Sequence, residues 1–292
     1  QSLNERVLEL VVRDHTTASV RSATALLRNA GFKVAHHLMP NLPGASPQDD
    51  LETCRQLFED PAYRPDALKI YPCVVIETAE LFQWWNDGRY LPYDDATLVE
   101  LLLGMKALVP PYARIERIIR DIPSTSIAAG CLITNLRQEL QRRMRAGGLR
   151  CRCIRCREIR QTSGGAFELT RLEYAAADGR ALFLSFEDRA LDRLAAFLRL
   201  RLPGGAADLP VLQGAALIRE LHTYGMHLPL HERDDDAAQH RGLGRRLVAE
   251  AERIARESGA STMAVIAGVG VREYYRKLGY ALKDTYMVKS LG

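Results

Sequence analysis

Three cysteines lie within a six-residue stretch, Cys151, Cys153 and Cys156, and arginines stand on both sides of them. The C-x-C-x2-C pattern supplies three soft ligands on a tight turn, which is what a tetrahedral zinc ion requires. The flanking positive charges would lower the thiol pKa values and favour thiolates that bind metal. Two alternatives stay open: unliganded cysteines in a loop, and an iron–sulfur cluster, for which this spacing is less typical. Cys131 is the nearest candidate for a fourth zinc ligand, and a histidine or a solvent molecule would also serve.

A glycine-rich segment, Gln239 to Arg245, leads directly into a predicted helix. Gly242 and Gly244, on either side of Leu243, have no Cβ, so a phosphate can approach the backbone closely. A helix N-terminus adds unpaired N–H groups and the positive end of the helix dipole. This pattern suits a pyrophosphate, although a lone G-x-G fits a helix entry without a ligand about equally well.

The surroundings of these glycines resemble a known superfamily. Q-x-x-G-x-G at a helix start, with Gln239 first, resembles the acetyl-CoA pyrophosphate loop of the GNAT acetyltransferases, and Val271 to Tyr280 resembles their closing helix and strand. The resemblance implies that Tyr274 or Tyr275 lies beside the thioester sulfur, where a phenol can protonate a departing thiolate or orient the acyl group. Helix packing is the alternative, and we expect it to hold for at least one of these tyrosines.

The same resemblance implies that the preceding strand, Ile218 to Tyr224, runs beside the acetyl and pantetheine groups. Its backbone N–H groups would then bind the acetyl carbonyl as an oxyanion hole does. Glu220 and His222 are candidate bases on this strand. An ordinary histidine in a sheet is an equally good interpretation of His222.

The segment from Arg137 to Arg160 holds nine arginines, two glutamates and no lysine. Its local charge, nine minus two or +7, exceeds the +4 of the whole chain. Leu136, Leu140 and Met144 form an apolar stripe at helical spacing, which predicts a helix that ends at Gly147-Gly148. A cationic face without matching acids suits a phosphate backbone, so we interpret the segment as a surface for RNA or a nucleotide. A solvated helix face is the alternative.

Composition sets limits on the class of protein. The 292 residues are 47% hydrophobic and 26% charged, which excludes a polycation or an acidic disordered chain and leaves room for one large domain or two ordinary ones. No run approaches the roughly 18 apolar residues of a membrane span, and no signal peptide opens the chain. Because the sequence lacks an initiator Met and begins inside a helical pattern, we expect it to be a fragment or to lack its N-terminal part.

Alternating helical and strand-like patterns in the first hundred or so residues predict a parallel α/β sheet, open or closed into a barrel. Helices are expected at 3–13, 17–29, 47–59 with Ser46 as N-cap, and 95–108, and strands at 32–39, 67–71 and 115–119. Strands dominate further on, at 167–175, 181–186, 194–200, 215–224, 262–266 and 286–289, with helices at 242–258 and 271–278.

Taken in order, the motifs resemble the Elongator complex protein 3 family over essentially the whole chain. Segments 37–44, 68–72 and 117–123 resemble its radical-SAM half, and the cysteine turn, residues 219–222, the glycine segment and 271–280 resemble the rest. The cysteine turn favours the single-chain bacterial or archaeal type. The resemblance implies an α/β fold in which a partial radical-SAM (β/α) barrel, residues 1–125, is joined through a basic helix and zinc-binding turn, residues 126–162, to a GNAT-like mixed α/β acetyltransferase domain, residues 163–292.

The family modifies carbon 5 of the wobble uridine in tRNA, using acetyl-CoA and a radical made from S-adenosylmethionine at a [4Fe–4S] cluster. The resemblance therefore implies a cytoplasmic tRNA uridine(34) acetyltransferase, or carboxymethyluridine synthase, that binds the tRNA anticodon stem-loop, spans no membrane and is compatible with a homodimer. The candidate catalytic residues are Tyr274, Tyr275 and His222. Acetyl-CoA would contact Glu220, Leu221, His222, Thr223, Gln239, Gly242, Leu243, Gly244 and Tyr274. The candidate tRNA-binding residues are Arg137, Arg142, Arg143, Arg145, Arg152 and Arg155.

One departure from the family pattern concerns the cluster. The family's three cluster cysteines lie on a loop ending C-x2-C near the start of the barrel, and Cys54 and Cys73 are too isolated to replace them. We therefore expect S-adenosylmethionine and the cluster in the full-length protein only, and no complete radical step by this chain. Two other classes of function remain: a GNAT-type protein lysine acetyltransferase, whose peptide groove is usually acidic, and a tRNA-binding scaffold that holds acetyl-CoA without chemistry.

Overall fold

A computed structural model of the protein describes residues 1–119, 122–160, 165–204, 209–225 and 242–292. These residues form two compact units, the first made of Gln1–Ser22 and Val34–Cys156 and the second of Ala23–Lys33 and Arg157–Gly292. Helix α2 (Thr17–Asn29) begins in the first unit and ends in the second. No helix in the described part of the chain is long and apolar enough to cross a membrane.

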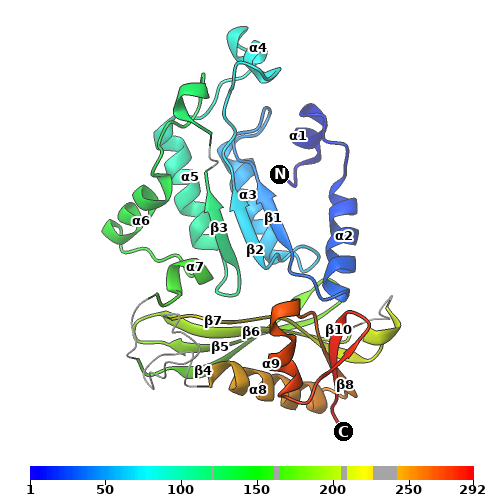
Figure 1. Ribbon diagram of the computed structural model, residues 1–292. Coiled ribbons are helices and arrows are strands. Elements are labelled where there is room, and N and C mark those ends of the chain that lie inside the picture. Colours follow the sequence, from blue (N-terminus) through cyan, green and yellow to red (C-terminus); the bar gives the residue numbers. More distant parts are fainter. Residues whose placement is uncertain (120–121, 161–164, 205–208, 226–241) are drawn as a thin grey trace. The chain divides into compact units, whose positions relative to one another are not determined.

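The first unit contains three parallel strands in the order β1-β2-β3, which are β1 (Ala35–Leu38), β2 (Ala67–Ile70) and β3 (Arg114–Ile118). Helix α3 (Pro47–Glu59) connects the first two strands and α5 (Asp95–Leu108) the last two, as Figure 1 shows. Parallel neighbours require such crossover connections, so the predicted alternation of strand and helix is confirmed.

Side-chain caps fix the start of both connecting helices. The Ser46 hydroxyl accepts a hydrogen bond from the Asp49 N–H (3.2 Å), and the Asp49 carboxylate accepts one from the Ser46 N–H (2.9 Å). This reciprocal pair is a capping box and confirms Ser46 as the N-cap of α3. Asp94 caps α5 by accepting from the Thr97 N–H at 2.7 Å.

Shorter elements complete the first unit. These are α1 (Glu5–Leu10), α4 (Leu81–Asn86), a 3-10 turn η1 (Ser124–Ser126), α6 (Leu136–Ala146) and α7 (Ile154–Arg157). Helix α6 buries Leu136, Leu140 and Met144 and ends at Gly147, so the apolar stripe predicted for the arginine-rich helix is confirmed.

The second unit contains a seven-stranded sheet in the order β4-β5-β6-β7-β8-β10-β9. Its strands are β4 (Glu168–Ala176), β5 (Gly179–Asp188), β6 (Arg193–Leu202), β7 (Ala215–Thr223), β8 (Thr262–Val265), β9 (Ala281–Lys283) and β10 (Tyr286–Ser290). Neighbours are antiparallel except for β7 and β8, which run parallel. The parallel connection contains α8 (Leu243–Glu257), and the turns η2 (Pro210–Leu212) and η3 (Val269–Val271) and helix α9 (Arg272–Arg276) complete the unit.

Helix α8 forms the core of the second unit with one face of this sheet (Figure 1). Its buried residues Leu243, Leu247 and Ala251 belong to the same apolar cluster as Leu198 and Ile218 of the sheet. Apolar area removed from water contributes about 25 cal/mol per Å², so this contact is a main source of stability for the unit.

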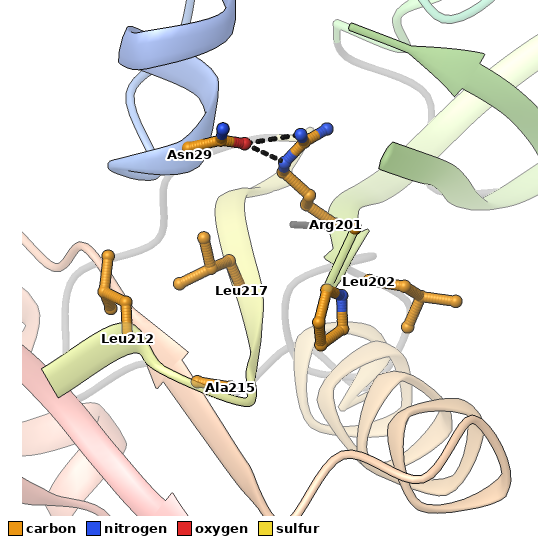
Figure 2. A pocket seen from close by; sticks show the side chains of 8 residues that line it. Asn29, Arg201, Leu202, Leu212, Ala215 and Leu217 are labelled. Carbon is orange, nitrogen blue, oxygen red and sulfur yellow. Dashed lines mark hydrogen bonds between the residues drawn. The ribbon is translucent and has the colours of Figure 1, made fainter. Parts of the chain in front are cut away.

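The end of α2 contacts the sheet of the second unit at Arg201 of β6. Figure 2 shows the Asn29 side-chain oxygen accepting two hydrogen bonds from the Arg201 guanidinium, at 3.0 and 2.5 Å. Asp178 and the Ala176 carbonyl accept further bonds from the same guanidinium. Burial lowers the pKa of Arg201 to about 10. Arg201 also lines the pocket drawn in Figure 2. Because protein acceptors already bind its guanidinium, we assign no ligand to this pocket.

Several element boundaries differ from the sequence-based expectation. The helix expected at 3–13 is only α1, because Val12 takes a left-handed conformation with φ 53°. The helix expected at 271–278 is divided into η3 and the short α9. Helices α4 and α7 and strand β9 were not expected; each has three to six residues, too few to show a period.

Candidate functional site

Strands β7 and β8 separate partway along their length. They pair only from Ala215 to Ile218 on β7, whereas β7 continues to Thr223 and β8 ends at Val265. Strand β6 still pairs with the other edge of β7 up to Thr223. None of the described strands pairs with the β8-facing edge of residues 219–223.

The N-terminus of α8 follows in the chain. Gly242 is its N-cap, with φ 67° and ψ 20°, a conformation that favours glycine, and a Cβ placed there would meet nothing within 4 Å. The first intrahelical bond runs from the Arg246 N–H to the Gly242 carbonyl at 3.0 Å. The N–H groups of Leu243, Gly244 and Arg245 therefore have no acceptor inside the helix, as an anion site requires. Gln239 lies outside the described residues.

Gly244 is the residue at which the predicted site residues converge. A Cβ on Gly244 would lie 3.1 Å from the Tyr274 hydroxyl oxygen, 3.7 Å from Thr223 Cγ2 and 3.9 Å from Leu221 Cδ2. The structure thus brings the start of α8, the end of β7 and α9 together, although Tyr274 lies 51 positions after Thr223 along the chain. A thin ligand can pass between them only because residue 244 has no side chain.

The two neighbouring tyrosines have different environments. Tyr274 is 37% exposed. Burial of the remainder of its side chain raises its pKa above that of an ordinary tyrosine, and the positive charge of Arg245 opposes this rise. Tyr275 is 5% exposed, belongs to the α8 core and packs edge-on against Tyr274 and Tyr280. Burial raises the pKa of Tyr275 further than that of Tyr274, beyond the usual range of phenols. Tyr275 therefore packs in the core, whereas Tyr274 is the tyrosine that a ligand can reach.

Glu220 and His222 point away from this convergence. Glu220 pairs with Arg199 and His222 with Phe197, whereas Leu221 pairs with Leu198, which lies on the α8 side of the sheet. Since successive side chains of a strand alternate between faces, Glu220 and His222 lie on the face opposite α8. The Glu220 carboxylate accepts from Arg199 Nε at 2.8 Å and lies 3.6 Å from Lys33 Nζ. The structure therefore does not bring these two candidate bases together with Tyr274, and only their backbone groups border the gap.

Sequence reasoning did not count Arg245 and Arg246 as site residues. Both stand in the first turn of α8, which holds no acidic residue. Positive charges at a helix N-terminus oppose the helix dipole, so two arginines there suit a site that binds an anion. That unfavourable charge placement was a signal available in the sequence.

The cysteine turn forms a compact group within the first unit. The Sγ atoms of Cys151, Cys153 and Cys156 all lie within 4.8 Å of one another. Three sulfur ligands of one tetrahedral zinc ion, at about 2.3 Å from the metal, stand roughly 3.8 Å apart, so the turn has the dimensions of such a site. Cys131, the nearest candidate for a fourth ligand by sequence, is not in this group among the described residues, and Asp95 is its neighbour.

A buried lysine accompanies these cysteines. Lys106 is fully buried, and its Nζ lies 3.9 Å from Cys156 Sγ. The pKa of Cys156 is lowered, chiefly by hydrogen bonds from the other two thiols. The positive charges of Lys106 and Arg137 lower it further. The hydrogen bonds among the thiols and burial raise the pKa of Cys151. The flanking arginines were expected to lower the pKa values of all three thiols. Only the pKa of Cys156 is lowered, and the cations that contribute are Lys106 and Arg137.

The arginines proposed to bind tRNA occupy different settings. Arg142, Arg143 and Arg145 are exposed on α6, and Arg152 is exposed in the turn. Glu139 accepts from Arg142 at 2.7 and 2.9 Å and from Arg143 at 2.8 Å. The half-buried Arg137 donates to the Ile115 carbonyl at 3.2 Å, and burial lowers its pKa. Arg155 is half-buried as well. The exposed cations therefore cluster on α6 and at Arg152.

The fold and the site define a chain that combines two known modules. Residues 65–146 match the Radical_SAM C-terminal domain, and residues 166–280 match the Acetyltransferase (GNAT) family. Parallel strands carrying the first module and a mixed sheet carrying the second agree with the fold class expected from the sequence.

Longer relatives match the whole chain. The tRNA uridine(34) acetyltransferase of Dehalococcoides mccartyi is 51% identical over 302 residues, which cover 100% of this chain and 65% of that protein. Elongator complex protein 3 of Danio rerio is 43% identical, over 100% of this chain and 55% of that protein. The solved structure of the archaeal Methanocaldococcus infernus Elp3 with N-terminus deletion (1-46) is 41% identical, with a TM-score of 0.91, over 99% of this chain and 70% of that one. The chain belongs to the Elongator complex protein 3/tRNA uridine(34) acetyltransferase family, and it spans about two thirds or less of the length of the first two relatives.

Proposed function

We propose that this chain carries the acetyl-CoA and tRNA-binding part of a tRNA uridine(34) acetyltransferase, a carboxymethyluridine synthase that modifies carbon 5 of the wobble uridine. The observation that carries the proposal is the convergence of Tyr274, Thr223 and Leu221 on Gly244 at the start of α8. The names of the relatives supply the acceptor, tRNA uridine(34).

The site has a group for each part of acetyl-CoA. The N–H groups of Leu243, Gly244 and Arg245 bind the pyrophosphate, with the charges of Arg245 and Arg246 beside it. The pantetheine arm runs along the β8-facing edge of β7 at residues 220–223, as a further strand would. An N–H group on that edge holds the acetyl carbonyl oxygen and stabilises negative charge that develops on it.

Tyr274 is the residue that handles the thiolate. A phenol is protonated at neutral pH, and burial raises the pKa of Tyr274 further. In hydrolysis, water adds to the acetyl carbonyl carbon, the C–S bond breaks, and the Tyr274 hydroxyl gives its proton to the departing thiolate while the proton lost by the water restores the phenol. Tyr275 orients Tyr274 through the edge-on contact between the rings, whose centroids are 5.2 Å apart. Neither Glu220 nor His222 is assigned the role of a base, because their side chains lie on the face of the sheet opposite α8.

The three cysteines of the turn fit one zinc ion. When bound, zinc would be held by Cys151, Cys153 and Cys156 and would tie the turn together as a structural centre. Lys106 offsets part of the negative charge of the thiolates, which explains why an ammonium group is buried there.

Within the described ranges, the residues outside the cysteine turn do not fit a second, iron–sulfur site. Cys54, Cys73 and Cys131 are buried, form no disulfide, and form no three-ligand group with described neighbours. S-adenosylmethionine and the [4Fe–4S] cluster therefore belong, in this proposal, to the full-length protein, and no reaction step through them is assigned to these residues.

The remaining parts of the proposal concern partners and organisation. The exposed arginines of α6 and Arg152 bind the tRNA anticodon stem-loop, the protein acts in the cytoplasm, and a homodimer is compatible with this role. Residues 1–125, 126–162 and 163–292 correspond to the barrel part, the basic linker with its cysteine turn, and the acetyl-CoA domain.

The experiment that tests this function is acetyl-CoA hydrolysis by the purified chain, with and without tRNA. An anticodon stem-loop that contains uridine 34 should stimulate release of free CoA. A protein lysine acetyltransferase would instead be stimulated by lysine peptides, and an inert scaffold would bind acetyl-CoA without releasing CoA under any of these conditions. Either of those two results would contradict the proposal.

A further inference from the structure

We propose that His222 and Tyr224 form the surface on which the base of the acceptor nucleotide stacks. This inference rests on the proposed function and adds to it the residues that receive the uracil ring. It gives His222 a role in positioning the acceptor instead of the acid–base role considered from the sequence.

The first observation is a series of aromatic rings across three strands. Phe183 on β5 and Phe197 on β6 stack with centroids 5.2 Å apart and an interplanar angle of 28°. His222 on β7 continues the series, 6.0 Å from Phe197 at 25°, and Tyr224 lies 4.3 Å from His222. Phe183 and Phe197 are each 1% exposed, whereas His222 is exposed. The series therefore leads from the buried sheet to an accessible imidazole.

The second observation is that this ring series is held firmly. The Arg199 guanidinium lies over the rings of Phe183 and Phe197, at 5.5 and 5.2 Å from their centroids, and donates to Glu220 at 2.8 Å. Packing against Phe183 and against the Arg199 guanidinium, which is itself paired with Glu220, leaves the Phe197 ring few alternative positions. A preorganised aromatic surface loses less conformational entropy when a ring stacks on it than a mobile one does.

The third observation is the position of the rings relative to the acetyl-CoA site within the second unit. Leu221 and Thr223 border the Gly244 convergence, and His222 lies between them in the chain but on the opposite face. On the α8 face, the helix itself, Gly244 and Tyr274 surround the expected thioester. In this proposal the acceptor approaches the acetyl group from the His222 face, where the rings of His222 and Tyr224 lie side by side with centroids 4.3 Å apart.

The chemistry of these side chains suits a nucleobase. Aromatic and imidazole rings bind unpaired bases by stacking, while phosphate contacts supply most of the affinity without selecting the base. A lysine side chain, the acceptor of a protein acetyltransferase, has no planar group that would use this surface.

The test compares two anticodon stem-loops that differ only at position 34, one with uridine and one with an abasic site. Both RNAs make the same phosphate contacts, so the ratio of their dissociation constants isolates the contribution of the base. The unmodified chain should bind the uridine RNA about tenfold or more tightly than the abasic RNA. His222→Ala should bring this ratio close to one, Tyr224→Ala should reduce it, and His222→Phe should preserve it, because phenylalanine stacks without titrating.

Controls keep the outcomes distinct. His15→Ala removes an exposed imidazole from the first unit and should leave the ratio unchanged. Circular dichroism and acetyl-CoA binding verify that each variant is folded. If the unmodified chain binds RNA and shows tRNA-stimulated hydrolysis but His222→Ala keeps the full ratio, the stacking inference is wrong and the proposed function stands. If His222→Phe loses hydrolysis while the ratio persists in both His222 variants, His222 acts through its imidazole nitrogens instead. Failure of the unmodified chain to bind the stem-loop overturns the proposed function and this inference together.

Discussion

The hydroxyl oxygen of Tyr274 lies 3.1 Å from the point that a Cβ would occupy on Gly244. That distance is shorter than an ordinary contact of a Cβ, so a side chain at position 244 would displace the tyrosine or occupy the space between them. The glycine thus serves two purposes: it exposes the backbone N–H groups at the start of α8, and it leaves room for a ligand beside the phenol. In the proposed function, this relationship connects the end of the site assigned to the pyrophosphate with the end assigned to the thioester.

Replacing Tyr274 separates binding from chemistry. Tyr274→Phe keeps the ring but removes the hydroxyl, so the affinity for acetyl-CoA should change little, whereas tRNA-stimulated hydrolysis should fall roughly a hundredfold if the phenol donates a proton. Tyr275→Phe is the matched control, because that ring is buried and should mainly affect stability. Isothermal titration and a free-thiol assay measure the two quantities. Equal hydrolysis by Tyr274→Phe and the parent would exclude the phenol as the proton donor.

The cysteine turn should retain zinc through purification. Metal analysis should find about one zinc per chain, as a structural tetrahedral site requires. Cys153→Ser should lower that content and the unfolding temperature, whereas Cys54→Ser, which changes a buried cysteine outside the group, should keep the metal. Finding a folded, metal-free protein whose three thiols are all alkylated freely would rule out the zinc site.

Salt dependence tests the arginine surface. Changing Arg142, Arg143 and Arg145 to Glu should weaken tRNA binding and flatten its dependence on salt, since each lost phosphate contact removes about 0.9 from the logarithmic slope on duplex, or ~0.7 on a single strand. Glu139→Gln should have the opposite effect, because it releases Arg142 and Arg143 from the carboxylate that now accepts their hydrogen bonds. Binding titrations at several salt concentrations give both slopes. Unchanged affinity in the triple variant would place the RNA elsewhere.

Asp50 makes the stability of the first unit depend on pH. Burial raises its pKa from 3.8 to about 6, although the Asn41 N–H and the Tyr93 hydroxyl donate to it at 2.7 and 3.0 Å. A raised pKa means that the folded state favours the neutral acid. The resulting contribution to stability, on the order of 2–3 kcal/mol, is present below pH ~4 and is lost as pH rises through 6.

Urea unfolding at pH 5 and pH 7 measures this effect. The parent should lose stability over this interval relative to Asp50→Asn, which cannot ionise. Asp14→Asn, at an exposed aspartate, is the matched control and should follow the parent. Parallel pH profiles for the parent and Asp50→Asn would show that the carboxyl group does not titrate in this range.

Local signals in the sequence were sufficient for much of the fold. The Ser46 cap, the apolar stripe of α6 and the glycine at the start of α8 each act within a few residues, so their patterns predicted elements that the structure confirms. Short elements such as α4 and β9 were missed because hydrophobic periodicity cannot be recognised in so few residues.

The site was harder to predict because its members meet through tertiary structure. Spacing along β7 could not tell which side chains face α8, and the strand register places Leu221 and Thr223 there and His222 opposite. Lys106 gave no signal at all, because 50 residues separate it from Cys156 and only the packing of α5 against the turn brings their side chains together. Arg245 and Arg246 could have been recognised, since adjacent cations at a helix N-terminus call for an anion.

The most direct test of the acetyl-CoA site is the affinity of Gly244→Glu for acetyl-CoA, measured by calorimetry beside the parent and Ala249→Glu. Ala249 is exposed on the same helix, so this control adds the same charge to α8 away from its N-terminus. A carboxylate at position 244 would face the pyrophosphate at partial burial, where two like charges 4 Å apart cost about 4 kcal/mol, or roughly a thousandfold in dissociation constant. The account predicts no measurable binding by Gly244→Glu and parental binding by Ala249→Glu. Parental affinity in a folded Gly244→Glu protein would contradict the assignment of this helix N-terminus to the pyrophosphate.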